Sequence, residues 1–206
     1  MMVWTFHTGQ ICIAGTRLLV EQTIYDAFTQ RLAAASRAIV IGDPGAADTV
    51  MGPLVSAAQR ARVEHYVAQG IAEGAHLACG GRRPAGHDRG FFFEPTLFTG
   101  VVNDMAIARE EIFGPVIAAI PFADEADAVR IANDSDFGLY GYVWSGDTAR
   151  AVRVARALRT GTVQINGASP NPDAPFGGFK MSGVGRDGGR YAIDAYTERK
   201  YIGWTA

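Results

Sequence analysis

The chain has 206 residues, 48% of them hydrophobic, and its 21 acidic and 19 basic residues give a net charge of −2. This length supports a substantial α/β domain whose core needs no disulfide bonds, and the two cysteines lack metal-binding spacing. The balanced charge without a basic block argues against a nucleic-acid partner, and no run approaches the ~18 apolar residues of a membrane span. Because the N-terminus lacks a signal-peptide pattern, we expect a cytoplasmic protein that does not associate with a membrane.

The first third of the chain predicts one strand and two helices. A strand is expected over 16–20 and a helix over 23–39, in which Thr23 and Asp26 have the spacing of a capping box. The expected buried face of this helix consists of Ile24, Phe28, Leu32, Ala35 and Ile39. A second helix is expected from Ser56 to Gly74, with Ser56 and Gln59 forming its N-terminal cap and Gly74 ending it. Its expected buried face consists of Val63, Val67 and Ile71.

Strands and helices alternate through the middle of the chain. Strands are predicted at 75–79, 91–98, 116–122, 138–145 and 162–166, and helices at 124–133, capped by Asp124 and Asp127, and at 147–158. The Gly- and Arg-rich segment 80–90 is expected to be an exposed loop. This alternation predicts an open, mostly parallel sheet with helices on both faces.

The last 40 residues have a different texture. Residues 167–189 are dense in Gly and Pro and form a longer loop than an ordinary connection, which is typical of a functional segment. A short helix near 190–196 and a strand near 198–204 close the chain, and we expect that strand to pair with a neighbour. We therefore divide the chain into a domain at 1–180 and a C-terminal helix and oligomerisation strand at 181–206.

Cys12 is the first residue with candidate chemistry. A cysteine between Ile11 and Ile13 is more often a small core residue than a nucleophile. Gly9 and Gly15 favour the second interpretation, because glycines allow sharp turns that place free backbone N–H groups beside a thiol. Such groups make a thiol easier to ionise and create an oxyanion site.

The motif "REEIFGPV" at 109–116 is the second candidate. One carboxylate of the pair Glu110 and Glu111 could accept hydrogen bonds from a ligand hydroxyl while Phe113 supplies an aromatic wall. The same residues also fit an ordinary loop in which the two carboxylates are solvated and Phe113 packs in the core. His7 could assist Cys12, although no third orienting group is evident. No His, Asp or Glu cluster has metal-ligand spacing, so we expect no metal site.

Six motifs in order resemble the aldehyde dehydrogenase family: "GQICIAGTRLLV", "EPTLF", "EEIFGPV", "NDSDFGLYGYVWS", "GTVQIN" and "PFGGFKMSGVGR". The resemblance implies that Cys12 attacks the aldehyde carbonyl to give a thiohemiacetal, that hydride passes to NAD or NADP, and that water hydrolyses the thioester. It implies that Glu111 binds the nicotinamide ribose and that Phe113 lies against the nicotinamide. It also implies that Ile11, Ile13 and Phe176 border the substrate funnel. The family's terminal strand pairs across a subunit interface, so the resemblance implies a homo-oligomer.

The family's cofactor-binding domain, oxyanion asparagine and general-base glutamate precede the cysteine, and we expect this chain to lack them. In addition, His7, Thr8, Gly9 and Gln10 stand where many relatives have Asn-Gln-Gly-Gln. We therefore expect negligible aldehyde oxidation by the chain alone, with activity when a companion chain supplies the cofactor domain, because loss of a general base costs roughly 10²- to 10⁴-fold. Two alternatives remain: a non-catalytic remnant or assembly module, and a weak cofactor-independent thiol esterase.

Overall fold

The computed structural model describes residues 4–206, which form two compact units that divide between Asp134 and Ser135. The helices are η1 (Phe6–Gly9, a 3-10 helix), α1 (Tyr25–Arg37), α2 (Ala57–Ala72), α3 (Ala106–Arg109), α4 (Glu125–Asn133), α5 (Thr148–Ala157) and α6 (Tyr191–Asp194). The strands are β1 (Arg17–Glu21), β2 (His76–Cys79), β3 (Thr96–Thr99), β4 (Val116–Phe122), β5 (Phe137–Gly138), β6 (Tyr140–Val143), β7 (Thr162–Ile165) and β8 (Phe179–Lys180). The boundary expected at residue 180 is a different division of the chain and stays a prediction.

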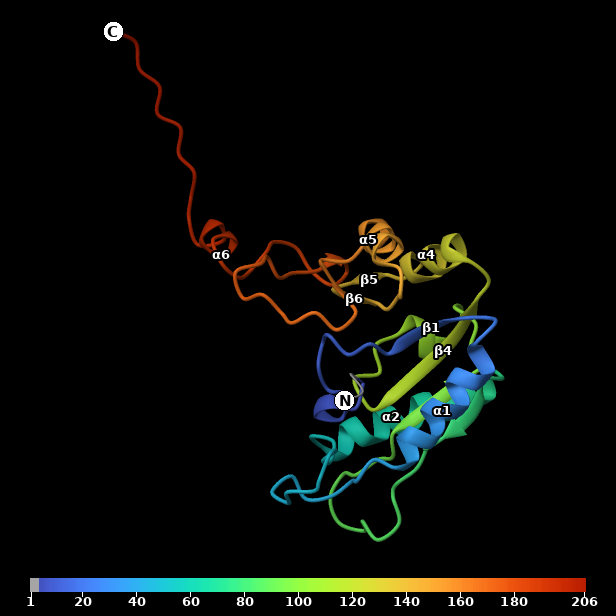
Figure 1. Ribbon diagram of the computed structural model, residues 1–206. Helices are drawn as coiled ribbons and strands as arrows, with labels where there is room; N and C mark the ends of the chain where they lie inside the picture. The colour runs from blue at the N-terminus through green and yellow to red at the C-terminus, as the bar shows by residue number, and fades with distance from the viewer. Residues whose placement is uncertain (1–3) are drawn as a thin grey trace. The chain divides into compact units, whose positions relative to one another are not determined.

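The first unit contains a four-stranded sheet in the order β1-β4-β3-β2, with β1 and β4 labelled in Figure 1. β4 pairs in parallel with both β1 and β3, whereas β2 runs antiparallel to β3 at the edge. The predicted, mostly parallel sheet is confirmed.

Side chains of β4 alternate between two apolar clusters, because successive residues of a strand point to opposite faces. Val116, Ala118 and Ile120 pack in the cluster that includes residues of α2. Ile117 and Ala119 pack in the cluster that includes Tyr25 and Ala33 of α1. Helices therefore cover both faces of the sheet, as the sequence predicts.

Capping was predicted correctly for two helices and wrongly for one. The Ser56 hydroxyl accepts a hydrogen bond from Gln59 N at 3.1 Å, and the Asp124 carboxylate accepts one from Asp127 N at 2.9 Å. Helix α1 has Ile24 at its N-cap and no side-chain cap, so the capping box predicted at Thr23 and Asp26 is absent.

The predicted apolar face of α1 is confirmed at Leu32, which packs partly buried against the core, but the fully buried face is shifted by one residue. The buried side chains of this helix are those of Tyr25, Thr29, Ala33 and Ser36. Ile24 and Phe28, which were expected in the core, are 51% and 42% exposed. On α2, Val63 and Val67 are buried as predicted, but Ile71 is 51% exposed.

The second unit holds two small sheets. β6 and β7 pair in parallel with α5 packed on them, and β5 pairs antiparallel with β8. The single strand predicted at 138–145 is thus split between two sheets, and β8 and α3 were not predicted. No helix in the part of the chain that the structure describes is long and apolar enough to cross a membrane.

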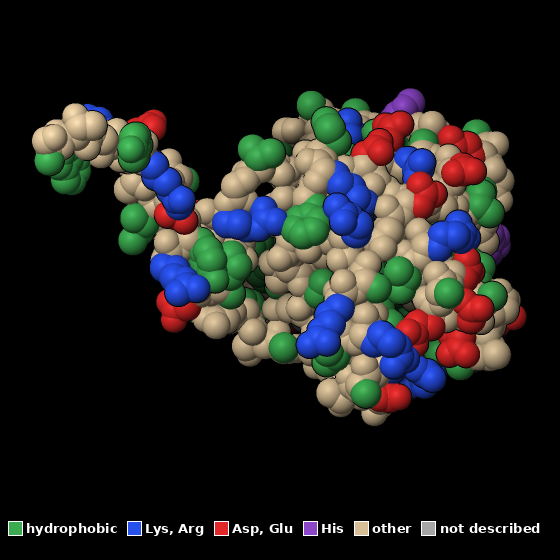
Figure 2. Space-filling view, turned by 90° about the horizontal axis from the view of Figure 1, so that it is seen from above, with side chains coloured by type: hydrophobic (Ala, Val, Ile, Leu, Met, Phe, Trp, Pro, Cys, Tyr) green, Lys and Arg blue, Asp and Glu red, His purple; other side chains and the backbone are tan. Residues whose placement is uncertain are grey.

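The tail after α6 holds no helix or strand over residues 197–206. Its apolar side chains are highly exposed, and Figure 2 shows hydrophobic groups on this tail. A strand needs a hydrogen-bonded neighbour, and within residues 4–206 no segment pairs with the tail. The prediction that residues 198–204 pair across a subunit interface stays a prediction.

Candidate active site

Two loops meet at the same edge of the main sheet. The turn with Cys12 comes directly before β1, and the segment Glu110–Phe113 comes directly before β4. Because β1 and β4 are parallel neighbours, with Arg17 opposite Ala118, the N-terminal ends of both strands lie at the same end of the sheet. The fold thus brings the cysteine motif and the "REEIFGPV" motif into one neighbourhood.

Cys12 lies in a tight turn. Ala14 N donates to Ile11 O at 2.9 Å, so Cys12 and Ile13 form the middle of the turn. The Cys12 side chain is exposed, and Ile11 and Ile13 are half-buried. Among residues 4–206, neither the thiol nor the backbone N–H of Cys12 has a hydrogen-bond partner. Both groups are therefore free to meet a ligand, and Cys12 is not the small core residue of the alternative interpretation.

The residues before Cys12 have a strained backbone. His7, Thr8 and Gly9 have φ of 50°, 59° and 71°, a left-handed conformation that costs energy for the two non-glycine residues. At Gly9 an added Cβ would lie 2.1 Å from Gly114 O, so only glycine allows the two loops to touch here. Gly15, predicted to serve a similar turn, does not have a positive φ.

Hydrogen bonds hold this strained segment to residues 52–55. Thr8 Oγ1 donates to Gly52 O at 3.0 Å. The Gln10 side chain accepts from Val55 N at 2.9 Å and donates to His7 O at 3.2 Å. The His7 ring is tilted by 57° to the Phe6 ring with centroids 4.1 Å apart, and no hydrogen bond joins it to Cys12 among the described residues. The structure does not assemble the Cys12–His7 couple.

Helix α2 binds the main chain of the second loop. Gln59 Nε2 donates to Ile112 O at 3.0 Å and to Phe113 O at 2.7 Å. Arg62 donates to Glu111 O through Nη2 and to Ile112 O through Nε at 3.3 Å. Sequence analysis missed these anchors. With Tyr66 they form a polar stripe at i, i+3 and i+7, a spacing that could have revealed a second functional face on the helix.

The two carboxylates of the loop have different environments. The Tyr66 hydroxyl donates to Glu110 Oε2 at 2.6 Å, and burial together with this bond raises the pKa of Tyr66. The Glu111 carboxylate has no hydrogen bond or ion pair within the described part of the chain. Phe113 is 36% exposed, whereas Ile112, which lies between Glu111 and Phe113, is buried. Glu111 and Phe113 thus present an acceptor and an aromatic face to solvent.

Phe176 belongs to the second unit and is described by itself. Its main chain exchanges two hydrogen bonds of 2.7 Å with Asp187, and its ring is 41% exposed. It lines a hollow of about 510 Å³ formed by the Gly-rich segment 176–187 and residues near the tail.

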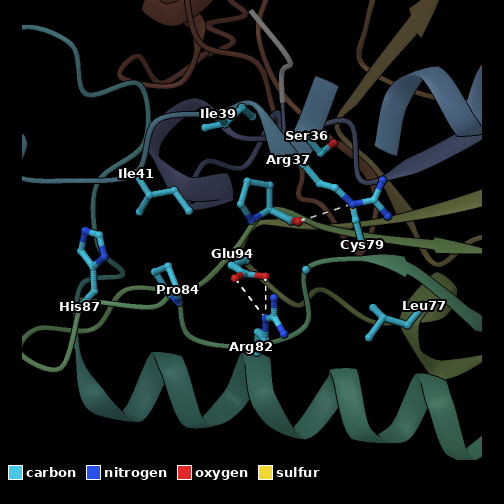
Figure 3. Close-up of a pocket in the computed structure, with 12 residues that line it drawn as sticks. Ser36, Arg37, Ile39, Ile41, Leu77, Cys79, Arg82, Pro84, His87 and Glu94 are labelled. Atoms are coloured by element: carbon cyan, nitrogen blue, oxygen red, sulfur yellow. Dashed lines mark hydrogen bonds and ion pairs between the residues drawn. The ribbon is translucent and has the colours of Figure 1, made fainter. Parts of the chain in front are cut away.

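A larger hollow of about 640 Å³ in the first unit contains none of the predicted site residues (Figure 3). It lies among the end of α1, strand β2 and the loop 80–95. Arg82 in its wall is paired with Glu94 at 3.2 Å, and Cys79 Sγ faces Pro95 O at 3.8 Å. Burial raises the pKa of the Cys79 thiol and so disfavours its thiolate form. Among the residues described, no three potential metal ligands come together anywhere.

Known proteins resemble this chain over nearly its whole length. The family model "Aldehyde dehydrogenase family" matches residues 1–202. Betaine aldehyde dehydrogenase of Bacillus subtilis is 47% identical over 200 residues, which are 96% of this chain and 41% of that protein. The 3-succinoylsemialdehyde-pyridine dehydrogenase of a Pseudomonas species is 48% identical over 197 residues, 95% of this chain and 41% of that protein.

Solved structures agree with this result. An aldehyde dehydrogenase of Mycobacterium tuberculosis, in complex with NAD+, has a TM-score of 0.93 at 44% identity and covers 100% of this chain. This chain covers 44% of that structure, and about two fifths of the curated relatives' length. The match of the model, the identities and the shared fold together establish that this chain belongs to the aldehyde dehydrogenase family.

Proposed function

We propose that this chain supplies the nucleophile for NAD(P)-dependent oxidation of an aldehyde to a carboxylic acid. The observation that carries the proposal is the turn at Cys12, which exposes a thiol next to its own unbonded backbone N–H. Of the two cysteines only this one is exposed, since Cys79 is buried. A soft, accessible nucleophile beside a free donor suits addition to a carbonyl group.

Cys12 would act in two covalent steps. The thiolate sulfur adds to the aldehyde carbon, so that a C–S bond forms and the carbonyl electron pair moves to oxygen, where the Cys12 N–H stabilises the negative charge. In the last step water attacks the thioester carbon, the C–S bond breaks, and the carboxylic acid and free thiol are released. Between these steps, bound NAD(P)+ supplies the oxidant that accepts hydride.

Glu111 and Phe113 fit part of a nicotinamide site. The Glu111 carboxylate, which has no hydrogen bond within residues 4–206, can accept hydrogen bonds from the ribose hydroxyls, and the exposed Phe113 ring offers a flat apolar face to the nicotinamide. Glu110 is less suited to this role because the Tyr66 hydroxyl donates to its Oε2 and holds the carboxylate against α2. NAD+ is the cofactor in the solved relatives' complexes, and NADP+ is the alternative.

The substrate proposal stops at the aldehyde class. The relatives are named for two different aldehydes, betaine aldehyde and a pyridine succinoylsemialdehyde. We assign Ile11 and Ile13, half-buried beside the thiol, to the near wall of the substrate funnel. The role of Phe176 at the border of the funnel stays a prediction from the family resemblance. Oxidation further requires the remaining part of the family's catalytic machinery, from a companion chain or a longer form of this protein. A homo-oligomer built through the tail is part of the same proposal.

Competition between an aldehyde and iodoacetamide for Cys12 tests the proposal. Iodoacetamide should add one group at Cys12, and millimolar aldehyde should slow this addition. Cys12→Ser should remove the modification, and Cys79→Ser, the matched control, should leave it unchanged. An inert Cys12 would refute the proposal. An alkylated Cys12 that aldehydes never protect would favour the assembly-module alternative, and steady ester turnover through Cys12 without NAD+ would favour the thiol esterase.

A further inference from the structure

Three successive carbonyl groups of the loop before β4 accept hydrogen bonds from two side chains of α2. They belong to Glu111, Ile112 and Phe113, and the donors are Gln59 and Arg62. Carbonyl groups in an exposed loop are ordinarily solvated by water. Here the hydrogen bonds to these carbonyl groups attach the loop to α2, in addition to the connection of the loop to the sheet.

The loop conformation needs such an attachment. Phe113 has φ of 60°, in the left-handed region that is unfavourable for a bulky residue. Ile112 is buried and points its side chain into the core, so Glu111 and Phe113 on either side of it point outward. The same carbonyl bonds that offset the strain at Phe113 therefore fix the directions of the two outward side chains.

Arg62 is itself held in place. Its guanidinium lies 4.9 Å from the centre of the Tyr66 ring, and Nη2 donates to Tyr66 Oη at 3.2 Å. Tyr66 in turn donates to Glu110 Oε2. The positive charge of Arg62 is thus directed at main-chain oxygens, and the Glu111 carboxylate receives no bond from it.

We propose that Gln59 and Arg62 are positioning residues that hold the main chain of Glu111–Phe113 so that this carboxylate and ring are preorganised for a dinucleotide. This inference rests on the cofactor role proposed above for Glu111 and Phe113. A loop fixed before binding does not lose its conformational entropy on binding, which increases affinity without any new contact to the ligand.

Hydrogen exchange of the peptide 110–116 in the full 206-residue chain tests the inference. In Arg62→Lys, one ammonium group cannot reach two carbonyls in the fork geometry of a guanidinium. In Gln59→Glu, a carboxylate replaces the amide donor and repels both carbonyl oxygens. Both variants should speed exchange in 110–116 at least about tenfold and leave β1 and residues 117–122 of β4 unchanged.

Arg60→Lys and Gln69→Glu make the same chemical changes on the same helix at positions that do not contact the loop. They should leave exchange in 110–116 at the parent rate. Unchanged exchange in both loop variants, or a rise spread equally over the sheet, would overturn the inference.

A second measurement separates this inference from the proposed function. Millimolar NAD+ should slow exchange in 110–116 of the parent chain, and it should protect Arg62→Lys less. Equal protection in parent and variant would count against positioning. Protection absent from the parent would count against the cofactor role of Glu111 and Phe113, and exchange without NAD+ would still decide whether Gln59 and Arg62 order the loop.

Discussion

A side chain at Gly9 would have two separate energetic costs, backbone strain and steric overlap. The residue combines a φ of 71° with a carbonyl oxygen 2.1 Å from the position of an added Cβ. Gly74 also has a positive φ, of 93°, but open space around it. A comparison of alanine at the two positions therefore separates backbone strain from steric overlap.

We expect Gly74→Ala to lower the free energy of unfolding by about 1 kcal/mol, from strain alone. Gly9→Ala should lower it by about 3 kcal/mol, since the Cys12 turn and the Gly114 loop must also move apart. Urea unfolding of the two variants measures both values. Equal losses would show that the approach of Gly9 to Gly114 adds nothing to the cost.

Cys79 makes stability depend on pH in the alkaline range. Burial raises the pKa of its thiol above the ordinary value of 9.0, so in that range the folded protein holds a proton that the unfolded chain releases. The stabilising contribution is complete below pH ~9 and is lost as pH rises beyond it. In a Cys12→Ala background, where Cys79 is the only thiol, the free energy of unfolding should fall as pH rises above about 9. Adding Cys79→Ala should flatten this fall, and an unchanged slope would contradict the assignment.

The sequence named candidate site residues, whose roles stay predictions, but it did not indicate the residues that hold their loops in place. Cys12 and Glu111 belong to short local motifs, and the structure places both motifs at one edge of the sheet. Gln10, Gln59 and Arg62 act on backbone atoms 45 to 54 positions away, and such pairing follows from tertiary structure. The different environments of Glu110 and Glu111 likewise come from a distant residue, because the Tyr66 hydroxyl donates to the Glu110 carboxylate.

Among the elements, helix α2 shows where reasoning from the sequence pattern succeeds and helix α1 shows where it fails. On α2 the cap is local, because a serine hydroxyl bonds a backbone N–H three residues ahead. On α1 the buried face is polar, and each of its hydroxyl groups finds a backbone acceptor. Tyr25 Oη donates to Ala119 O, Thr29 Oγ1 to Tyr25 O and Ser36 Oγ to Leu32 O. Counting apolar residues overlooks a face whose polar groups are satisfied this way.

The caps give a direct comparison between the two helices. Ser56→Ala removes a bonded N-cap from α2 and should lower the free energy of unfolding by about 1 kcal/mol. Thr23→Ala removes a residue with the right spacing but no capping bond and should change it by less than about 0.5 kcal/mol. Thermal and urea unfolding of the pair measure the difference. A loss at Thr23 as large as that at Ser56 would mean that the capping box at α1 forms in solution.

At the scale of the whole molecule, the apolar tail is the feature that the single chain leaves without a partner. Tyr201, Ile202 and Trp204 are 92%, 70% and 85% exposed. Exposed aromatic and aliphatic groups in sequence with unpaired backbone are typical of a strand that completes its hydrogen bonds on another chain.

Deletion of residues 200–206 should therefore separate oligomerisation from folding. These side chains are all exposed, so their loss should change the free energy of unfolding by less than about 0.5 kcal/mol. Sedimentation velocity should show an oligomer for the parent chain and a monomer for the deletion at the same concentration. Val55→Ser, which removes a 78% exposed apolar side chain elsewhere, is the control and should keep the parent's mass. The two proteins differ only in residues 200–206. An oligomer that survives the deletion would therefore contradict the role of the tail, as would a parent chain that is monomeric at every concentration.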